Sequence, residues 1–276
     1  MPRAQPKSGK AASSKPSGPP AFPGLLEEMT IEEVRAFKAR VVVLPLGSTE
    51  PHGPHLPYGT DTFQVTRLCR EAVAKANARG ARALLYPALP ITNNANARKL
   101  PFALRMGVRT LMTVLVDIAT QVKADGVDKI VIVNGHGGNP GAILATLREI
   151  AGMDNMPFVC SCEGGRQCAP GFQTPIEHAS DHAGESETSR MLSIRPDLVR
   201  TAKLGNFPRG KVKVPMLATT DFVRPWHCYL PESAGGETRT SNAAKGETLY
   251  VAESDGIAEL LVQLAEAKFD ARFPYE

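Results

Sequence analysis

Short runs of aliphatic and β-branched residues alternate with longer amphipathic segments along this chain, and this alternation constrains the fold more than any other feature. The clearest run is VVVLPL at residues 41–46, which is apolar at consecutive positions, as is typical of a buried parallel strand. Further strands are predicted at Ala83–Tyr86, Lys129–Val133 and Phe158–Cys160. Helices are predicted at Asp61–Ala78, Val108–Ala124, Pro140–Ala151, Gly184–Leu192 and Ile257–Phe269. Strands that alternate with helices predict an α/β fold, in which one parallel sheet carries helices on both faces.

The first 24 residues differ in composition from the rest of the chain. They are rich in Pro, Ser, Ala, Lys and Gly, so they cannot bury enough apolar surface to offset the entropy lost on ordering. Residues 1–24 are therefore predicted to be a disordered tail. Thr30 and Glu33 form a capping-box pattern that opens the first short helix. No break in composition follows, so residues 25–276 are expected to form a single domain.

The net charge of +4 originates in this tail. Its four basic residues have no acidic counterpart, and the remaining 28 Lys and Arg residues equal the 28 Asp and Glu residues in number. The sequence offers no cluster of basic residues for a nucleic-acid partner. No apolar run approaches the roughly 20 residues of a membrane span, and no signal-peptide pattern opens the chain.

The five cysteines form no C-x-x-C pair. A zinc site built on Cys160, Cys162 and Cys168 would lack a fourth ligand at regular spacing. Reduced thiols in a cytoplasmic protein are the expected state.

Three polar segments carry the residues suited to chemistry, and two of them follow predicted strands. Residues 47–61, GSTEPHGPHLPYGTD, hold two carboxylates and two imidazoles, the ligand mix of zinc, manganese or iron(II). Residues 134–139, NGHGGN, form a glycine-rich turn around His136. A phosphate-binding turn is the alternative there, but the segment has no Lys and no G-x-G-x-x-G pattern.

The third segment, residues 178–189, places acids and imidazoles just before a helix, where Glu185 or Glu187 could also serve only as a favourable partner of the helix dipole. Five of the six histidines fall in these three segments. Such a distribution favours a metallohydrolase site assembled from distant loops. A serine hydrolase is the rival, but no G-x-S-x-G elbow is present.

These three segments together resemble the creatininase (creatinine amidohydrolase-like) family. GSTEPHGPHLPYGTD is similar to the GS-x-E-x-HG-x-HLP-x-x-TD block of that family, NGHGGN to its NGH-x-x-N block, and HAGESETS to its HAG-E-x-ETS block. The blocks occur in the order of the family, and the resemblance covers roughly residues 25–270. It implies a creatininase-like α/β fold and proteins that commonly form homohexamers.

The resemblance also implies roles for individual residues. Two divalent metal ions, zinc, manganese or iron, would be bridged by Asp61, with Glu50 and His136 completing one site and His52 serving the other. Creatininase itself has a glutamate where this chain has Gly138, so the missing carboxylate is expected to come from Glu185, with Glu187 as the alternative. His182 and Glu187 are expected to assist proton transfer.

The activity implied is hydrolysis of a small cyclic amide, lactam or formamide-type substrate by metal-activated water. Two alternatives remain open: ring C–C cleavage of a keto-polyol, and a non-catalytic metal- or ligand-binding protein of the same fold. The polar stretch Asn93–Arg98 and the segment Arg224–His227 are candidate rims of the substrate pocket.

Overall fold

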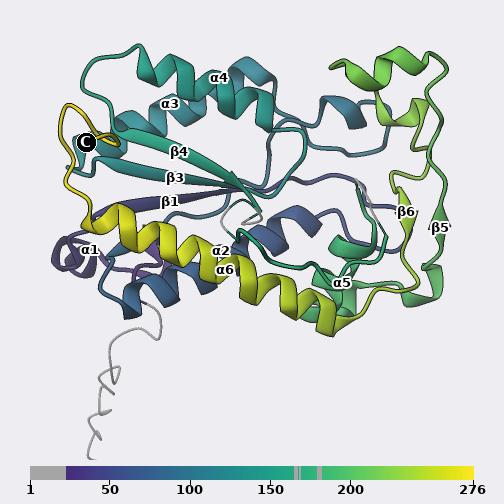
Figure 1. The fold of residues 1–276 in the computed structure, drawn as a ribbon, viewed down its shortest axis with the longest axis horizontal. Coiled ribbons are helices and arrows are strands. Elements are labelled where there is room, and N and C mark those ends of the chain that lie inside the picture. Colours follow the sequence, from purple (N-terminus) through teal and green to yellow (C-terminus); the bar gives the residue numbers. More distant parts are fainter. Residues whose placement is uncertain (1–22, 165–166, 168, 179–181) are drawn as a thin grey trace, which may run out of the picture.

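A four-stranded parallel sheet forms the centre of the protein (Figure 1). The computed structural model describes residues 23–164, 167, 169–178 and 182–276, so most of the predicted tail lies outside the described residues. The strand order is β2-β1-β3-β4, and every neighbouring pair is parallel. The strands are β1 (Val41–Leu46), β2 (Ala83–Leu85), β3 (Lys129–Asn134) and β4 (Phe158–Glu163). The predicted fold class is confirmed.

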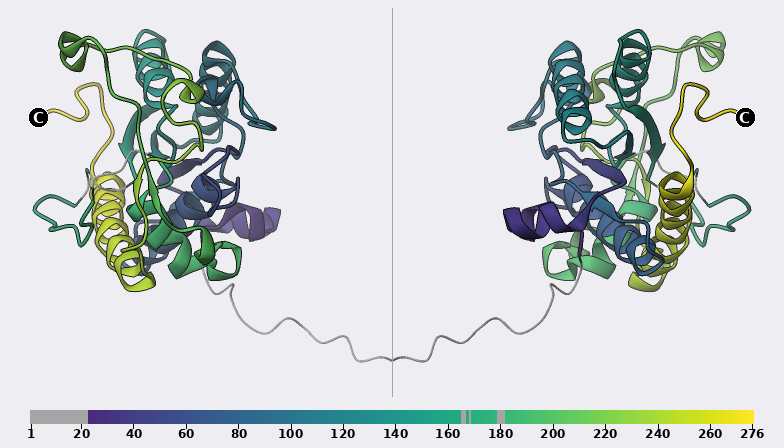
Figure 2. Two further views of the ribbon diagram at one scale, coloured as in Figure 1. Left: turned by 90° about the vertical axis from the view of Figure 1, so that its right-hand side faces the viewer. Right: turned by 90° about the vertical axis from the view of Figure 1, so that its left-hand side faces the viewer.

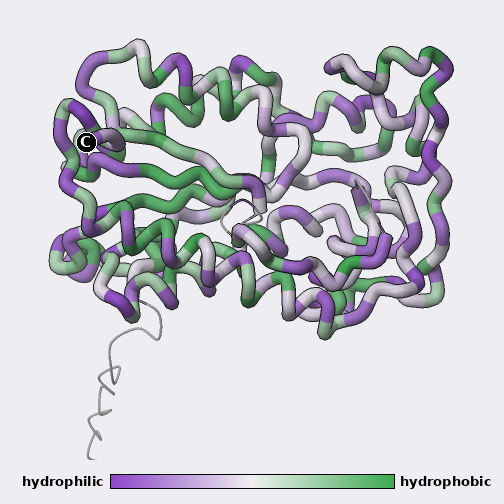
Figure 3. Tube along the Cα trace, in the orientation of Figure 1, coloured by the Kyte–Doolittle hydropathy of each residue, from purple (hydrophilic) through white to green (hydrophobic). Residues whose placement is uncertain are grey.

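Helices cover both faces of the sheet, as Figures 1 and 2 show. The helices are α1 (Ile31–Phe37), α2 (Thr60–Ala78), α3 (Val108–Ala124), α4 (Pro140–Ala151), α5 (Glu185–Ile194) and α6 (Ala243–Glu266). Val41 and Val43 pack in a core with α2 and α6, whereas Val42 and Leu44 pack with α3 and α4. Because alternate strand residues point to opposite faces, a strand between two helix layers must be apolar at every position. The strands accordingly form the most continuous hydrophobic stretches of the chain in Figure 3.

The predicted boundaries of most elements agree with the structure to within two residues, and α3 and α4 agree at both ends. The capping box of α1 is present, with Thr30 and Glu33 bonded reciprocally. Two elements differ from the prediction by more than two residues. Strand β4 continues to Glu163, and α6 spans Ala243–Glu266 instead of Ile257–Phe269.

The early start of α6 has a packing reason. Gly246 lies in its first turns, and a Cβ at this position would be 2.2 Å from the carbonyl oxygen of Ser189 on α5. Glycine disfavours a helix in isolation but permits this close approach of two helices. Gly246 therefore lowers the helix propensity of this segment, although the close packing of α6 on α5 requires a glycine there.

A peripheral layer lies beyond the carboxyl ends of the strands. It contains the two-stranded sheet of β5 (Asn206–Phe207) and β6 (Gly236–Glu237), and an arm of residues 208–225 between β5 and the short 3₁₀ helix η7 (Trp226–Cys228). The arm extends away from the sheet at the upper right of Figure 1. None of the helices in the described ranges is long and apolar enough to cross a membrane.

Candidate metal centre

The site forms where β1 and β3 end. Glu50 and His52 follow β1, His136 follows β3, and Asp61 and Glu187 lie in the first turns of α2 and α5. Parallel strands end at the same edge of a sheet, so loops far apart in sequence meet there. The structure thereby brings together residues from all three polar segments.

Ligand atoms in this site form groups within 4.8 Å of one another. One group is Glu50, Asp61 and His136, and another is His52, Asp61 and Glu187. The Nδ1 atom of His136 lies 3.0 Å from Glu50 Oε1 and 3.0 Å from Asp61 Oδ2. The Nε2 atom of His52 lies 3.0 Å from Asp61 Oδ1. Asp61 thus has one carboxylate oxygen directed to each group.

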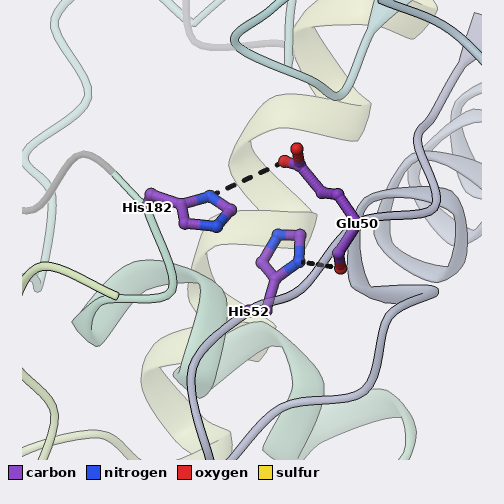
Figure 4. A group of neighbouring side chains, drawn as sticks. All are labelled: Glu50, His52 and His182. Carbon is purple, nitrogen blue, oxygen red and sulfur yellow. Dashed lines mark hydrogen bonds and ion pairs between the residues drawn. The ribbon is translucent and has the colours of Figure 1, made fainter. Parts of the chain in front are cut away.

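A backbone carbonyl accepts a hydrogen bond from each of these two histidines, from the ring nitrogen that does not face the carboxylates. His136 Nε2 donates to the carbonyl of Asn93 at 2.8 Å, and His52 Nδ1 donates to the carbonyl of Glu50 at 3.0 Å. A carbonyl can only accept, so these nitrogens carry the hydrogen, and in a neutral ring the opposite nitrogen presents its lone pair to the carboxylates. Metal-binding histidines are typically held by such outer hydrogen bonds. Figure 4 shows the His52 contact beside Glu50.

The carboxylates are buried without hydrogen-bond donors. Glu50 is 1% exposed, and neither of its oxygens has a hydrogen-bond partner in the described part of the chain; the same holds for Asp61 Oδ2. Buried anionic oxygens that face histidine lone pairs require a cation between them, either a proton or a metal ion. The donor set of carboxylate and imidazole fits a divalent transition metal.

Without a metal, protons take the place of that cation. Burial lowers the pKa of His52, but the carboxylate of Asp61, followed by Glu187 and Glu50, outweighs this and raises the pKa to about 10. Burial also lowers the pKa of His136, but the carboxylates of Glu50 and Asp61 outweigh it and raise this pKa well above its ordinary value. The pKa of Asp61 is held well below its usual range because His52 and His136 outweigh the effect of burial.

His182 lies at the edge of the cluster, packed between two rings. Its ring centroid is 3.9 Å from that of Trp226 and 4.2 Å from that of His52. Its Nε2 donates to the carbonyl of Pro51 at 2.9 Å, and Nδ1 lies 3.7 Å from Glu50 Oε1 (Figure 4). Burial, followed by the charge of His52, lowers its pKa well below the ordinary value. His182 is therefore neutral at pH 7, and its Nδ1 presents a lone pair to the cluster.

The two glutamates of α5 point in different directions. Glu187 Oε2 lies 3.7 Å from His52 Nε2 and accepts a hydrogen bond from the Ala183 amide at 2.6 Å. Glu185 is fully buried elsewhere, where its carboxylate pairs with Lys245 of α6 at 2.5 Å. Its other oxygen accepts the backbone N–H groups of Glu177 and His178. The structure thus brings Glu187 to the candidate ligands and leaves Glu185 outside every group of candidate ligands found among the described residues.

Two other histidines from the polar segments also lie outside these groups. His55 bonds Thr188 at 3.0 Å and stacks on Phe207, and burial lowers its pKa to about 4. The backbone of His178 anchors Glu185. His55 and His178 are therefore associated with the surrounding loops.

The sequence did not reveal the residues that hold the site's side chains in position. Asn93 acts through its backbone carbonyl, which no residue pattern reveals. Asn94, expected at the pocket rim, is buried and donates to Ser48 and to the carbonyl of Leu104. Trp226, which belongs to the second candidate rim, is buried and packs on His182.

Solvent reaches the cluster at Glu187. Its side chain is 27% exposed, whereas those of the other five cluster residues are at most 6% exposed. A cavity of about 220 Å³ lies beside it, lined by His136 and Glu187 together with Gln64, Asn134, Glu163 and Arg190.

Gly138 lies against the hydrogen bond that orients His136. A Cβ at this position would be 2.2 Å from the Asn93 carbonyl oxygen and 2.4 Å from His136 Nε2. We expect Gly138→Ala to displace His136 and to weaken metal binding by about 10- to 100-fold, the usual cost of disturbing an outer-sphere hydrogen bond. Elemental analysis after dialysis measures this. Gly137→Ala is the matched control, because its Cβ would meet no atom within 4 Å; equal metal contents in the two variants would contradict the prediction.

Comparisons with known proteins agree with this geometry. Residues 27–261 match the creatininase family of creatinine amidohydrolases. A mycofactocin precursor peptide peptidase of Mycobacterium tuberculosis is 30% identical over 223 residues, which cover 78% of this chain and 81% of that protein. A 3-dehydro-scyllo-inosose hydrolase of Thermotoga maritima is 26% identical, with 90% of this chain and 84% of that protein covered.

A solved structure shares the fold. The crystal structure of a candidate creatinine amidohydrolase from Bacteroides fragilis superposes with a TM-score of 0.80 at 28% identity, covering 90% of this chain and 99% of that one. The family match spans most of the chain, and the relatives named are hydrolases. This protein is therefore a hydrolase of the creatininase family.

Proposed function

We propose that the site holds two adjacent divalent cations, of zinc, manganese or iron. Glu50, Asp61 and His136 would bind one, and His52, Asp61 and Glu187 the other. The observation that carries this proposal is the buried Glu50 carboxylate, which no backbone amide or hydroxyl group satisfies among the described residues and which faces Nδ1 of His136 at 3.0 Å. The expected ligand Glu185 is replaced here by Glu187, because Lys245 and two backbone amides already occupy the Glu185 carboxylate.

The proposed reaction is hydrolysis of the C–N bond of a small amide. When bound, such a pair of cations polarises the substrate carbonyl and lowers the pKa of a water molecule towards neutral. Neutral His182 can accept a proton at Nδ1 and pass it to the leaving nitrogen. The Pro51 carbonyl and the ring of Trp226 fix the orientation of His182 during this transfer. Glu187, which the resemblance had also assigned to proton transfer, is proposed here as a metal ligand instead.

Amide hydrolysis is favoured over ring C–C cleavage by the chemistry shared among relatives. A peptidase and a creatinine amidohydrolase both cleave C–N bonds of carbonyl compounds. Because another relative is an inosose hydrolase, a keto-polyol is the alternative substrate. The exposed side chains of Val214 and Met216 on the arm support a further proposal, that the protein is a homo-oligomer.

The test combines metal analysis with a substrate panel. Protein loaded with zinc or manganese is assayed on linear N-acyl amino acids, on creatinine and other cyclic amides, and on cyclic keto-polyols. We expect release of an amine from an amide. Cleavage of keto-polyols alone would contradict the proposed bond type, and protein that retains no metal after loading would contradict the cation sites.

Metal binding should release protons. In the metal-free protein the raised pKa values of His52 and His136 keep both rings protonated at pH 7, and a cation can bind only the unprotonated nitrogens. We expect roughly two protons released as both sites fill, and an affinity that rises with pH. Calorimetric titration in buffers of different ionisation enthalpy measures the protons. A binding heat independent of the buffer would contradict the prediction.

A further inference from the structure

A second cavity, of about 440 Å³, lies under the arm. The basic residues Arg209, Lys211 and Arg224 line it from the arm side, and Asn96 lines it from the segment after β2. Apolar groups share the same wall, contributed by Val212, Phe222, Val223 and Tyr229. In Figure 1 the arm lies at the upper right, away from the helix layer of α2 and α6.

Positive charge dominates this cavity. Asp221 is the acidic residue among the lining residues, against three basic ones. Partial burial, followed by the charges of Lys99, Arg98 and Arg224, holds the pKa of His227 below its ordinary value. Arg98 and Lys99 are therefore two more cations close to this region. In the described part of the chain, Arg224, Lys211, Arg98 and Lys99 have no ion-pair partner. These four side chains are exposed and hydrated, and their combined charge attracts an anion towards the cavity.

The cavity and the metal centre are built from the same two segments. Asn93 orients His136 through its carbonyl, and Asn96, three residues later, lines the cavity. Trp226 packs on His182, and Cys228, two residues later, lines the cavity. Three residues of extended chain span at most about 10 Å. The basic cavity and the metal centre therefore lie close together along both segments.

We propose that this cavity, centred on Arg224 and Lys211, binds the carboxylate of an amide substrate whose scissile bond lies at the metal centre. The proposal rests on the amide hydrolysis proposed above and specifies its substrate class as an anionic amide with an apolar group next to the carboxylate. Arginine and lysine supply charged donors to the carboxylate. Phe222, Val223 and Tyr229 offer apolar surface to the neighbouring group.

Binding of a matched pair of compounds tests this without depending on turnover. N-acetylphenylalanine carries the carboxylate, and N-acetylphenylalaninamide is its neutral counterpart. Both are titrated by calorimetry into the metal-loaded protein. We expect the acid to bind about fivefold more tightly, since one partly exposed ion pair supplies up to about that factor. The preference should shrink as salt is added.

Two variants test whether the preference for the acid arises in this cavity. Arg224→Glu should abolish the preference for the acid, and because Arg224 is exposed the fold should tolerate the change. Arg35→Glu makes the same charge change on exposed α1 and should keep the preference. Equal affinities for acid and amide in the unaltered protein, including no binding of either, would overturn the proposal. So would a preference that survives in Arg224→Glu, because the carboxylate would then bind at the metals alone.

Hydrolysis is assayed separately on both compounds. A preference for the acid in binding without cleavage of either compound would overturn the proposed amide hydrolysis but leave the anion site supported. Cleavage of the neutral amide as fast as the acid, with equal affinities, would retain the activity and overturn the anion site.

Discussion

Asp61→Ala is expected to lower hydrolysis by at least about 100-fold and to reduce metal content more than any other single substitution, since loss even of a group that only orients a ligand costs about 10- to 100-fold. Asp61 is 2% exposed, and its two oxygens face His52 and His136 separately. Its removal takes one ligand from each proposed cation and also the negative charge that would lie between them.

Elemental analysis and activity, measured side by side after dialysis, decide this prediction. Asp61→Asn keeps the volume of the side chain and removes its charge, so it should lose metal as well if charge is the cause. Asp117→Ala, an exposed aspartate of α3, is the control and should keep both metal and activity. Two full equivalents of metal in Asp61→Ala would refute the bridging role.

Glu187→Gln is expected to lose one of the two metal equivalents and to reduce activity by at least about 100-fold. An amide is a poorer ligand than a carboxylate for a hard divalent cation, and Glu187 is the acid of α5 near His52. The cation held by Glu50, Asp61 and His136 should remain. Metal stoichiometry and turnover are the measurements.

Glu185→Gln supplies the matched comparison on the same helix. This change should leave metal content close to normal and lower the free energy of unfolding by about 1–2 kcal/mol, because Lys245 loses the Glu185 carboxylate but keeps its ion pair with Glu177. Denaturant titration of the metal-loaded protein measures that loss. A full metal count in Glu187→Gln together with a deficit in Glu185→Gln would return the ligand role to Glu185.

Local pattern was sufficient for most of the framework. The continuous apolar run of β1 predicts a strand covered on both faces because each alternate residue must contact a different helix layer. Glu50 and His52 could be assigned to one site because they are two residues apart at the end of that strand. His136 could be added because β3 ends at the same edge of the sheet.

The choice between Glu185 and Glu187 depended on tertiary contacts. Two residues apart on a helix, their side chains diverge by about 200°, so the sequence implies that only one reaches the metals but does not identify which. The rotation of α5 is set by its packing on α6, where Gly246 admits the backbone of Ser189 and Lys245 pairs with Glu185. That packing turns Glu187 towards His52.

The basic cavity was invisible to the sequence for a related reason. Its cations are dispersed along the chain as Arg98 and Lys99, Arg209 and Lys211, and Arg224, and no short window contains a basic cluster. The chain by itself determined its strands, its helices and the metal-binding character of three loops, because these follow from periodicity and residue type over short distances. Only the tertiary structure decided which carboxylate faces the candidate metal site and where the positive charge gathers, because both depend on contacts between segments that are far apart in the sequence.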